Sequence, residues 1–396
     1  MSRLRLRALL LTGSIFLGAG CSGGDTTLAD PAEAAVDAGA VSISPTTASA
    51  ATTAPAQTVA PTTMMPATSA APDTTVAVPV GVVPGQEWAI GELPDGVDEL
   101  VLDDAVDVAF GAAESPSRVR SIVLVRGGEI VYERYHPLDT ADTVMESFSV
   151  AKSFTSAVIG LLVGDGLLEV DAPAPVAAWS DPDDPRHAIT VENLLHMASG
   201  LDWSEVYAAG QPPLLMLQSA VASDYVSSLP LEANPGEKFE YSTGTTAILA
   251  GIITDTLGGP EAATAYIEER LLRPLGITST KFLRDGSGRW LGGIGADSTT
   301  RDFARFGLLF LNDGVWGGKQ ILPEGWVEYS RAPSPTNPEY GAQWWMRGGS
   351  TFEANGLFGQ LIRMVPDDDL VIAINATQGG DSYTLATAVQ TAFADV

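Results

Sequence analysis

Apolar and β-branched residues gather in alternating runs near both ends of the chain. Residues 120–135 hold two such runs around Gly127-Gly128, a pattern typical of a β-hairpin. Residues 359–377 hold two more around 366–369, where Pro is followed by three Asp, and they predict a second pair of strands. Strands so far apart in sequence are expected to meet in one mainly antiparallel sheet.

Between these strand regions, apolar positions recur at helical spacing. The pattern from Phe154 to Leu162 predicts a helix over about 149–163. Further candidate helices, separated by Pro and Gly, span 191–198, 244–257, 260–272, 299–313, 323–331 and 382–393. We therefore predict an α+β fold in which N- and C-terminal helices cover the sheet. A helical lobe of roughly residues 165–340 stands beside it, and a site would lie in the crevice between them.

The first residues follow a different pattern. Three arginines precede an apolar run over 8–17, and small residues then lead to Cys21. This layout predicts a signal peptide over 1–20, because the apolar run is too short and too Gly-rich for a stable anchor. Cys21 resembles the lipidated cysteine of a bacterial lipobox, although Gly18 departs a little from that pattern. We expect an envelope lipoprotein on the outer face of the membrane, or a secreted protein if Cys21 is not lipidated.

Residues 22–85 are rich in Ala, Thr, Pro, Ser and Val and contain no aromatic residue, Lys or Arg. Such a segment cannot bury enough surface to fold, so 21–85 is predicted to be a disordered tether and 86–396 the folded domain. The chain carries a net charge of −28, of which about −26 falls on 86–396. This charge argues against a nucleic-acid partner and leaves the N-terminal lipid as the expected membrane contact. Cys21 is the sole cysteine, which excludes a disulfide or a thiol nucleophile in the domain.

Ser149 precedes Lys152 by three residues at the head of the 149–163 helix. Residues with this spacing share a helix face, so the two side chains project together. A serine becomes a nucleophile when a base lies within hydrogen-bond reach, and burial can lower the pKa of a lysine until it serves as that base. The alternative is an ordinary exposed lysine in a first helical turn, since one such pair can arise by chance.

A second motif lies in PGEKFEYSTGTTAILA, residues 235–250. Tyr241 ends an extended stretch there, and a helix is predicted to follow directly. The hydroxyl of a tyrosine at this place is a candidate site group. Packing of its ring between the two lobes is the alternative.

These motifs together resemble the β-lactamase-related serine hydrolases, which include class C β-lactamases, D-Ala-D-Ala carboxypeptidases, family VIII esterases and 6-aminohexanoate-oligomer hydrolases. Further similar stretches are ITVENLLHMASGLDW (189–203), STTRDFARFGLLFLNDGVWGGKQILPEGWV (298–327) and ANGLFGQLIRMVPDDDLVIAI (354–374), so the resemblance covers nearly all of 88–396. It implies that Ser149 is the nucleophile, with Lys152 and Tyr241 as base and proton relay in undecided order. It also implies that the backbone N–H groups of Ser149 and Leu357 form an oxyanion hole.

The chain departs from this family in one informative place. The Lys-Thr-Gly of β-lactamases and carboxypeptidases, whose lysine helps to hold a substrate carboxylate, corresponds here to Ala354-Asn355-Gly356. The asparagine usual after Tyr241 is also missing. Because a neutral strand cannot pair with a carboxylate, we expect an esterase or amidase acting on a small molecule without an essential carboxylate, with Asn355 and Gly356 contacting substrate. The Gly-x-x-Gly-Gln variant of this strand makes the nylon-oligomer hydrolases the most similar subgroup.

The alternatives are a β-lactamase or D-Ala-D-Ala carboxypeptidase and, from another class, a catalytically silent surface protein that keeps the fold. Trp203 is a candidate for the acyl pocket, as are Trp344 and Trp345, with packing as the alternative for all three. His196 is predicted to be structural.

Other hydrolase chemistries find little support in the sequence. A G-x-S-x-G elbow is absent, which argues against a Ser-His-Asp hydrolase. The three histidines, His136, His187 and His196, lack the spacing of a metal-binding helix, and the cysteine lies at the end of the signal. No metal or cofactor is expected, and no nucleotide-binding fingerprint occurs.

Overall fold

The computed structural model describes residues 87–111, 118–378, 380–394 and 396. The predicted signal peptide, Cys21 and the tether lie outside these residues. Within the described residues, no helix combines the length and apolar character needed to cross a bilayer.

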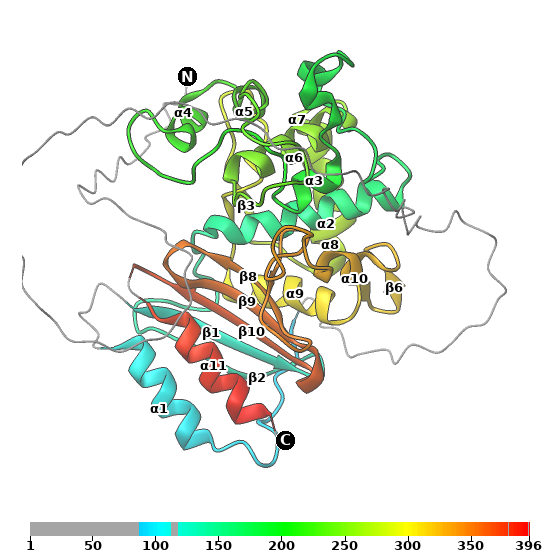
Figure 1. Cartoon of the computed structure of the whole chain (residues 1–396). Helices are drawn as coiled ribbons and strands as arrows, with labels where there is room; N and C mark the ends of the chain where they lie inside the picture. Colours follow the sequence, from blue (N-terminus) through cyan, green and yellow to red (C-terminus); the bar gives the residue numbers. More distant parts are fainter. Residues whose placement is uncertain (1–86, 112–117, 379, 395) are drawn as a thin grey trace, which may run out of the picture. The chain divides into compact units, whose positions relative to one another are not determined.

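A six-stranded antiparallel sheet joins the two ends of the domain, in the order β2-β1-β10-β9-β8-β7 (Figure 1). Its strands are β1 (Val119–Arg126), β2 (Glu129–Tyr135), β7 (Trp345–Met346), β8 (Phe352–Gly356), β9 (Gln360–Val365) and β10 (Leu370–Ala376). The predicted first hairpin is β1–β2 and the predicted second pair is β9–β10. β1 pairs directly with β10, from Val119 opposite Ala376 to Arg126 opposite Leu370. The predicted antiparallel sheet built from both ends of the chain is confirmed.

The two faces of the sheet pack against different helices because side chains alternate along each strand. On β1, Ile122 and Leu124 face a cluster that includes α1 (Glu99–Phe110) and α11 (Ser382–Phe393). Val123 and Val125 face the opposite way, into the larger cluster formed with the central helices. The red and cyan helices on one side of the sheet in Figure 1 are α11 and α1. The sequence thus makes a layered α+β fold, as expected.

The central part of the described chain is helical. Its helices are α2 (Ala151–Gly164), α3 (Val191–Leu195), α4 (Pro212–Gln218), α5 (Ala222–Ser227), α6 (Thr243–Thr256), α7 (Pro260–Ile267), α8 (Arg273–Leu275), α9 (Thr300–Leu311) and α10 (Trp326–Arg331). A 3₁₀ turn, η1 (Phe148–Val150), leads into α2. Short strands occur as the pairs β3 (Lys281–Phe282) with β4 (Ala296–Asp297), and β5 (Val315–Trp316) with β6 (Lys319–Gln320).

Most expected helices are present, with ends shifted by a few residues. The predicted 260–272 helix is wrong as a single α-helix, because α7 ends at Ile267 and a π-helical turn, η4 (Glu268–Leu272), leads into α8. α4 and α5 were not predicted, since each is too short for a clear periodic pattern.

α9 packs on the sheet, although it falls within the 165–340 stretch expected to form the helical lobe. A Cβ added at Gly307 would lie 2.7 Å from Ile362 of β9 and 2.8 Å from Val371 of β10, so this helix lies directly on the strands. On its other side, Phe306 stacks on Phe154 of α2 with ring centroids 3.8 Å apart. α9 therefore connects the sheet to the helix that follows Ser149.

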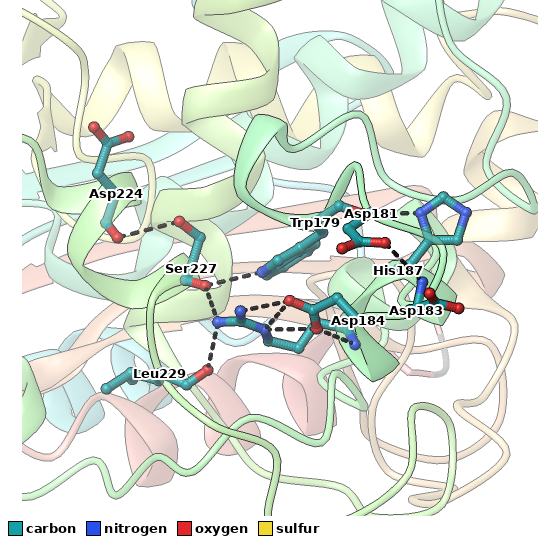
Figure 2. Close-up of polar contacts among 9 residues, drawn as sticks. Trp179, Asp181, Asp183, Asp184, His187, Asp224, Ser227 and Leu229 are labelled. Atoms are coloured by element: carbon teal, nitrogen blue, oxygen red, sulfur yellow. Dashed lines mark hydrogen bonds and ion pairs between the residues drawn. The ribbon is translucent and has the colours of Figure 1, made fainter.

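Polar contacts join the loop before α3 to the end of α5, through η2 (Ala177–Trp179) and η3 (Pro185–Ala188) (Figure 2). Arg186 pairs with Asp184 at 2.6 Å and donates to the carbonyl of Ser227 at 3.0 Å. The Trp179 indole N–H donates to the same carbonyl at 2.9 Å. The cluster of aspartates in this loop therefore caps a turn and holds a cation of the chain itself.

Two valines of α1 give a matched test of this packing. Val106 is 0% exposed against the sheet, whereas Val108 is 76% exposed two residues later. Val106→Ala should lower the free energy of unfolding by about 2 kcal/mol, because it removes two buried methyl groups and leaves a cavity. Val108→Ala should change it by less than about 0.5 kcal/mol. Urea unfolding of both variants measures this, and equal destabilisation would contradict the assigned helix face.

Candidate active site

Ser149 and Lys152 meet where η1 passes into α2. Ser149 lies in the 3₁₀ turn and is partly exposed, whereas Lys152, in the first turn of α2, is 1% exposed. The Lys152 Nζ lies 3.0 Å from the Ser149 Oγ. The predicted approach of these two side chains is therefore observed in the structure.

Lys152 is buried among oxygen acceptors from three other parts of the chain. Besides Ser149, its Nζ donates to Thr243 Oγ1 at 2.9 Å and to the Gly293 carbonyl at 3.0 Å. A Cβ at position 293 would lie 2.8 Å from the Thr243 backbone oxygen, so glycine lets this loop approach α6. Burial lowers the pKa of Lys152 to about 8, and the negative charge of Glu205 partly opposes that shift. A lysine in this environment can exchange a proton near neutral pH.

Tyr241 comes from the segment that enters α6, as the YST motif suggested. Ser242 caps this helix by accepting from the Thr245 N–H at 2.9 Å, and the helix begins at Thr243. The Lys152 Nζ lies 4.8 Å from the centroid of the Tyr241 ring. A hydrogen bond links the Tyr241 and Ser149 side chains, and burial raises the Tyr241 pKa well above its ordinary value. The phenol therefore stays protonated at neutral pH.

The end of β8 lies against the turn that carries Ser149. A Cβ added at Gly356 would lie 2.4 Å from the Ser147 carbonyl oxygen, so only glycine permits this approach. The Phe148 and Phe358 rings meet edge-to-face at 5.3 Å, and both residues have left-handed backbone, with φ of 44° and 67°. These contacts bring Leu357, the predicted second oxyanion donor, beside the Ser149 turn. Its role in oxyanion binding remains a prediction.

The same end of β8 holds the predicted substrate-binding pair, Asn355 and Gly356. The Asn355 side-chain amide donates to Glu353 Oε1 at 3.2 Å, and Ala354, at the position of the family's lysine, is buried. The strand therefore offers no cation of its own at this position.

The three candidate tryptophans lie in different environments. Trp203 is buried against α6, where a Cβ at Gly244 would meet its ring at 2.5 Å. Trp344 is fully buried and packs against Phe310 at 4.4 Å, which is the packing alternative. Trp345 is half-buried, and its ring lies 5.5 Å from the Tyr241 ring. Trp345 is thus in direct contact with the reactive cluster.

Glu205 is the site residue that sequence reasoning missed. One of its oxygens accepts from the Thr243 backbone N–H at 2.9 Å and the Trp203 indole N–H at 2.7 Å, and the other accepts from the Thr243 hydroxyl. Tyr207 also donates to this carboxylate, at 3.2 Å. The only available signal was its position two residues after the family-like stretch 189–203.

The histidines are held away from this cluster. His196 packs edge-to-face on Tyr329, and burial lowers its pKa to about 4, so it is neutral and structural, as expected. His187 contacts the Trp179 carbonyl at 2.8 Å, and His136 Nδ1 accepts from the Leu138 N–H at 3.2 Å. Among the described residues, no group of three or more His, Cys, Asp or Glu side chains could hold a metal ion.

The chain is similar to proteins that are named as hydrolases. The chain is 27% identical over 285 residues to the 6-aminohexanoate-dimer hydrolase of Paenarthrobacter ureafaciens, covering 64% of this chain and 71% of that protein. It is 25% identical over 200 residues to a D-alanyl-D-alanine-carboxypeptidase/endopeptidase of Escherichia coli, covering 48% of this chain and 51% of that protein.

A Bacillus anthracis structure assigned as a 6-aminohexanoate-dimer hydrolase superposes with a TM-score of 0.62 at 22% identity, over 80% of this chain and 89% of that one. That similarity shows the shared fold. The sequence pattern of the Beta-lactamase family matches residues 112–394, which include Ser149, Lys152 and Tyr241. The chain therefore belongs to the β-lactamase family and is a serine hydrolase of that family.

Proposed function

We propose that this protein hydrolyses an ester or an amide of a small molecule through an acyl-enzyme on Ser149. The observation that carries the proposal is the buried contact of Lys152 Nζ with Ser149 Oγ at 3.0 Å, with the lysine pKa lowered to about 8. A buried amine whose pKa is lowered toward neutrality can serve as the base for a serine nucleophile.

The proton path follows from the two opposite pKa shifts. The neutral fraction of Lys152 takes the Ser149 proton as Oγ attacks the substrate carbonyl carbon. The backbone N–H groups of Ser149 and Leu357 then hold the oxyanion. Tyr241, whose raised pKa keeps it protonated, donates to the departing alcohol or amine and is reprotonated by Lys152. A water molecule then attacks the carbonyl carbon of the acyl-enzyme, and the proton transfers run in reverse. The acyl–Oγ bond breaks, Ser149 regains its proton and the acid is released.

The residues at the end of β8 support a substrate without an essential carboxylate. β8 presents Asn355 and Gly356 beside the Ser149 turn, and buried Ala354 stands at the position of the family's lysine. The similarity to the Paenarthrobacter protein named 6-aminohexanoate-dimer hydrolase supports an amidase or esterase.

A second candidate, a β-lactamase or D-Ala-D-Ala carboxypeptidase, draws support from Arg347. Its guanidinium lies 5.4 Å from the centroid of the Trp345 ring, and Trp345 in turn contacts Tyr241. The buried carboxylate of Glu353 is shared by Arg347 at 2.6 Å and Arg363 at 2.8 Å, so two cations face one acid. Arg347, directly after β7, and Arg363 together carry one positive charge more than Glu353 balances. This charge is the feature that would attract a substrate carboxylate.

For the N-terminus we propose export and lipidation at Cys21, so that the hydrolase is attached to the outer face of the membrane. The sequence from residue 1 to Cys21 is the support for this proposal.

Ser149→Ala tests the nucleophile. With a short-chain p-nitrophenyl ester, the full chain should turn over, and the variant should lose at least about a thousandfold in kcat/KM because no acyl-enzyme can form. Nitrocefin serves as the parallel substrate. Fast nitrocefin turnover would favour the β-lactamase candidate. Equal ester turnover by both proteins would exclude Ser149, and no turnover of either would leave a silent fold, checked by fluorophosphonate labelling of Ser149.

The pH dependence tests Lys152 as the base. Because the neutral amine is the active form, kcat/KM should rise about tenfold per pH unit below pH 8 and level off above it. Lys152→Arg is the matched control, since arginine keeps the positive charge but cannot release its proton in this range. It should be nearly inactive throughout. A wild-type profile that is flat from pH 5 to 9 would contradict this assignment.

Cys21→Ser tests the anchor. In a bacterial host, the wild-type chain should sediment with membranes and carry the mass of attached lipid on its N-terminal peptide, whereas the variant should be soluble in the envelope or the medium. A wild-type N-terminus without added mass would reject lipidation.

A further inference from the structure

Glu205 lies in the loop before α4 and joins that loop to Thr243, which contacts Lys152. Its carboxylate accepts from Trp203 Nε1 at 2.7 Å and from the Thr243 N–H at 2.9 Å on one oxygen. Its other oxygen accepts from the hydroxyls of Thr243 and Tyr207. Tyr207 is 45% exposed, yet its hydroxyl is directed inward to this carboxylate.

The proton on the Thr243 hydroxyl therefore has one direction. A carboxylate accepts hydrogen bonds, and the Thr243 hydroxyl donates to Glu205 Oε1. Tyr207 Oη lies 3.2 Å from both Thr243 Oγ1 and Glu205 Oε1, so the single proton of Thr243 stays on this side, away from Lys152. The lone pairs of Thr243 Oγ1 are then left for other donors, and Lys152 Nζ lies 2.9 Å away. With respect to Lys152, Thr243 behaves as an acceptor only.

The same count of donors and acceptors determines how the N–H groups and the lone pair of neutral Lys152 are oriented. A neutral amine has two N–H groups and one lone pair, and three oxygens surround it. The Gly293 carbonyl can only accept, and Thr243 is held as an acceptor by Glu205. Both N–H groups are thereby engaged, and the lone pair is directed to the remaining partner, the Ser149 hydroxyl.

We propose that Glu205 is a positioning residue that, through Thr243, directs the lone pair of neutral Lys152 at Ser149. This inference rests on the proposed function, in which Lys152 is the base for Ser149. It also assigns a role to Thr243, which follows Tyr241 where the usual asparagine is missing: Thr243 accepts from the lysine, and Glu205 sets the direction of the Thr243 proton.

The other groups around Lys152 do not duplicate this role. From the segment before α6, Tyr241 presents its ring at 4.8 Å, and from the loop before α9, Gly293 presents a carbonyl that cannot reverse. Glu205 is the charged group that acts on the Lys152 pKa. Its removal should therefore have two separable effects, one on orientation and one on the lysine pKa.

Glu205→Gln distinguishes this role from simple support of the loop. The glutamine carbonyl should stay with the two N–H donors, Trp203 and Thr243, which need an acceptor. Its NH₂ group then faces the Thr243 hydroxyl and donates to it. Thr243 is freed to donate to the Lys152 lone pair, which competes with Ser149, while the shape of the side chain is unchanged.

The measurement is the rate of Ser149 labelling by a fluorophosphonate from pH 5 to 10. Glu205→Gln should lower the plateau rate at high pH, where Lys152 is fully neutral, by about 10- to 100-fold. It should also move the rising limb to lower pH, since a nearby negative charge is lost. Glu237→Gln, which removes the same charge at an exposed position, should match the wild type.

The Thr243→Val background completes the test. Without the hydroxyl there is no proton to direct, so adding Glu205→Gln should leave the plateau rate unchanged there. A plateau drop of equal size in both backgrounds, or no drop in either, would overturn the positioning role. If the wild-type chain is not labelled, or Ser149→Ala is labelled equally fast, the proposed function itself fails, which is a distinguishable result.

Discussion

The burial of one amine, that of Lys152, is the constraint on which the site depends. An ammonium group removed from water is costly unless oxygen atoms replace its hydration shell. Here those oxygens come from the η1 turn, the first residue of α6 and the loop before α9, three segments far apart in sequence. The contacts that satisfy the amine are therefore the same contacts that bring the nucleophile, the proton relay and the helical lobe together.

The packing around this point makes the positions stiff. α2 is held between α6 and α9, with Phe154 stacked on Phe306, so the head of the helix cannot shift without disturbing the core. The turn before it is anchored to β4, where Asp297 accepts from the Ser147 N–H at 2.9 Å and the Ala296 N–H donates to Ser147 Oγ at 2.7 Å. A rigid scaffold of this kind suits a reaction in which small displacements of the base are expensive.

Sequence reasoning reached the parts of this arrangement that are encoded locally. The spacing of Ser149 and Lys152, the helix after Tyr241 and the apolar strands at both ends each leave a signal within a few residues. Gly293 leaves no such signal, and Glu205 leaves only its position two residues after the stretch 189–203, because the roles of both depend on atoms contributed by α6 and α2. The packing of α9 on the sheet could not be predicted either. The periodicity of Phe303, Phe306 and Phe310 shows that one face of this helix is buried, but it does not show which element covers that face. Trp344 and Trp345 are neighbours in sequence, yet alternation along the chain sends one into the core and the other to the cluster.

The pairing of β1 with β10 has a consequence for when the protein becomes competent. In the sheet, β9 and β10 lie between β8 and the N-terminal hairpin. The pairing of β1 with β10 extends to Ala376, so residues this late in the chain complete the connection. A chain emerging from its N-terminus during synthesis would carry its serine and lysine long before the strand that brings Leu357 to them. Contacts this distant in sequence also form slowly. The arrangement of Leu357 beside Ser149 is thus complete only when the C-terminal sixth of the chain is present.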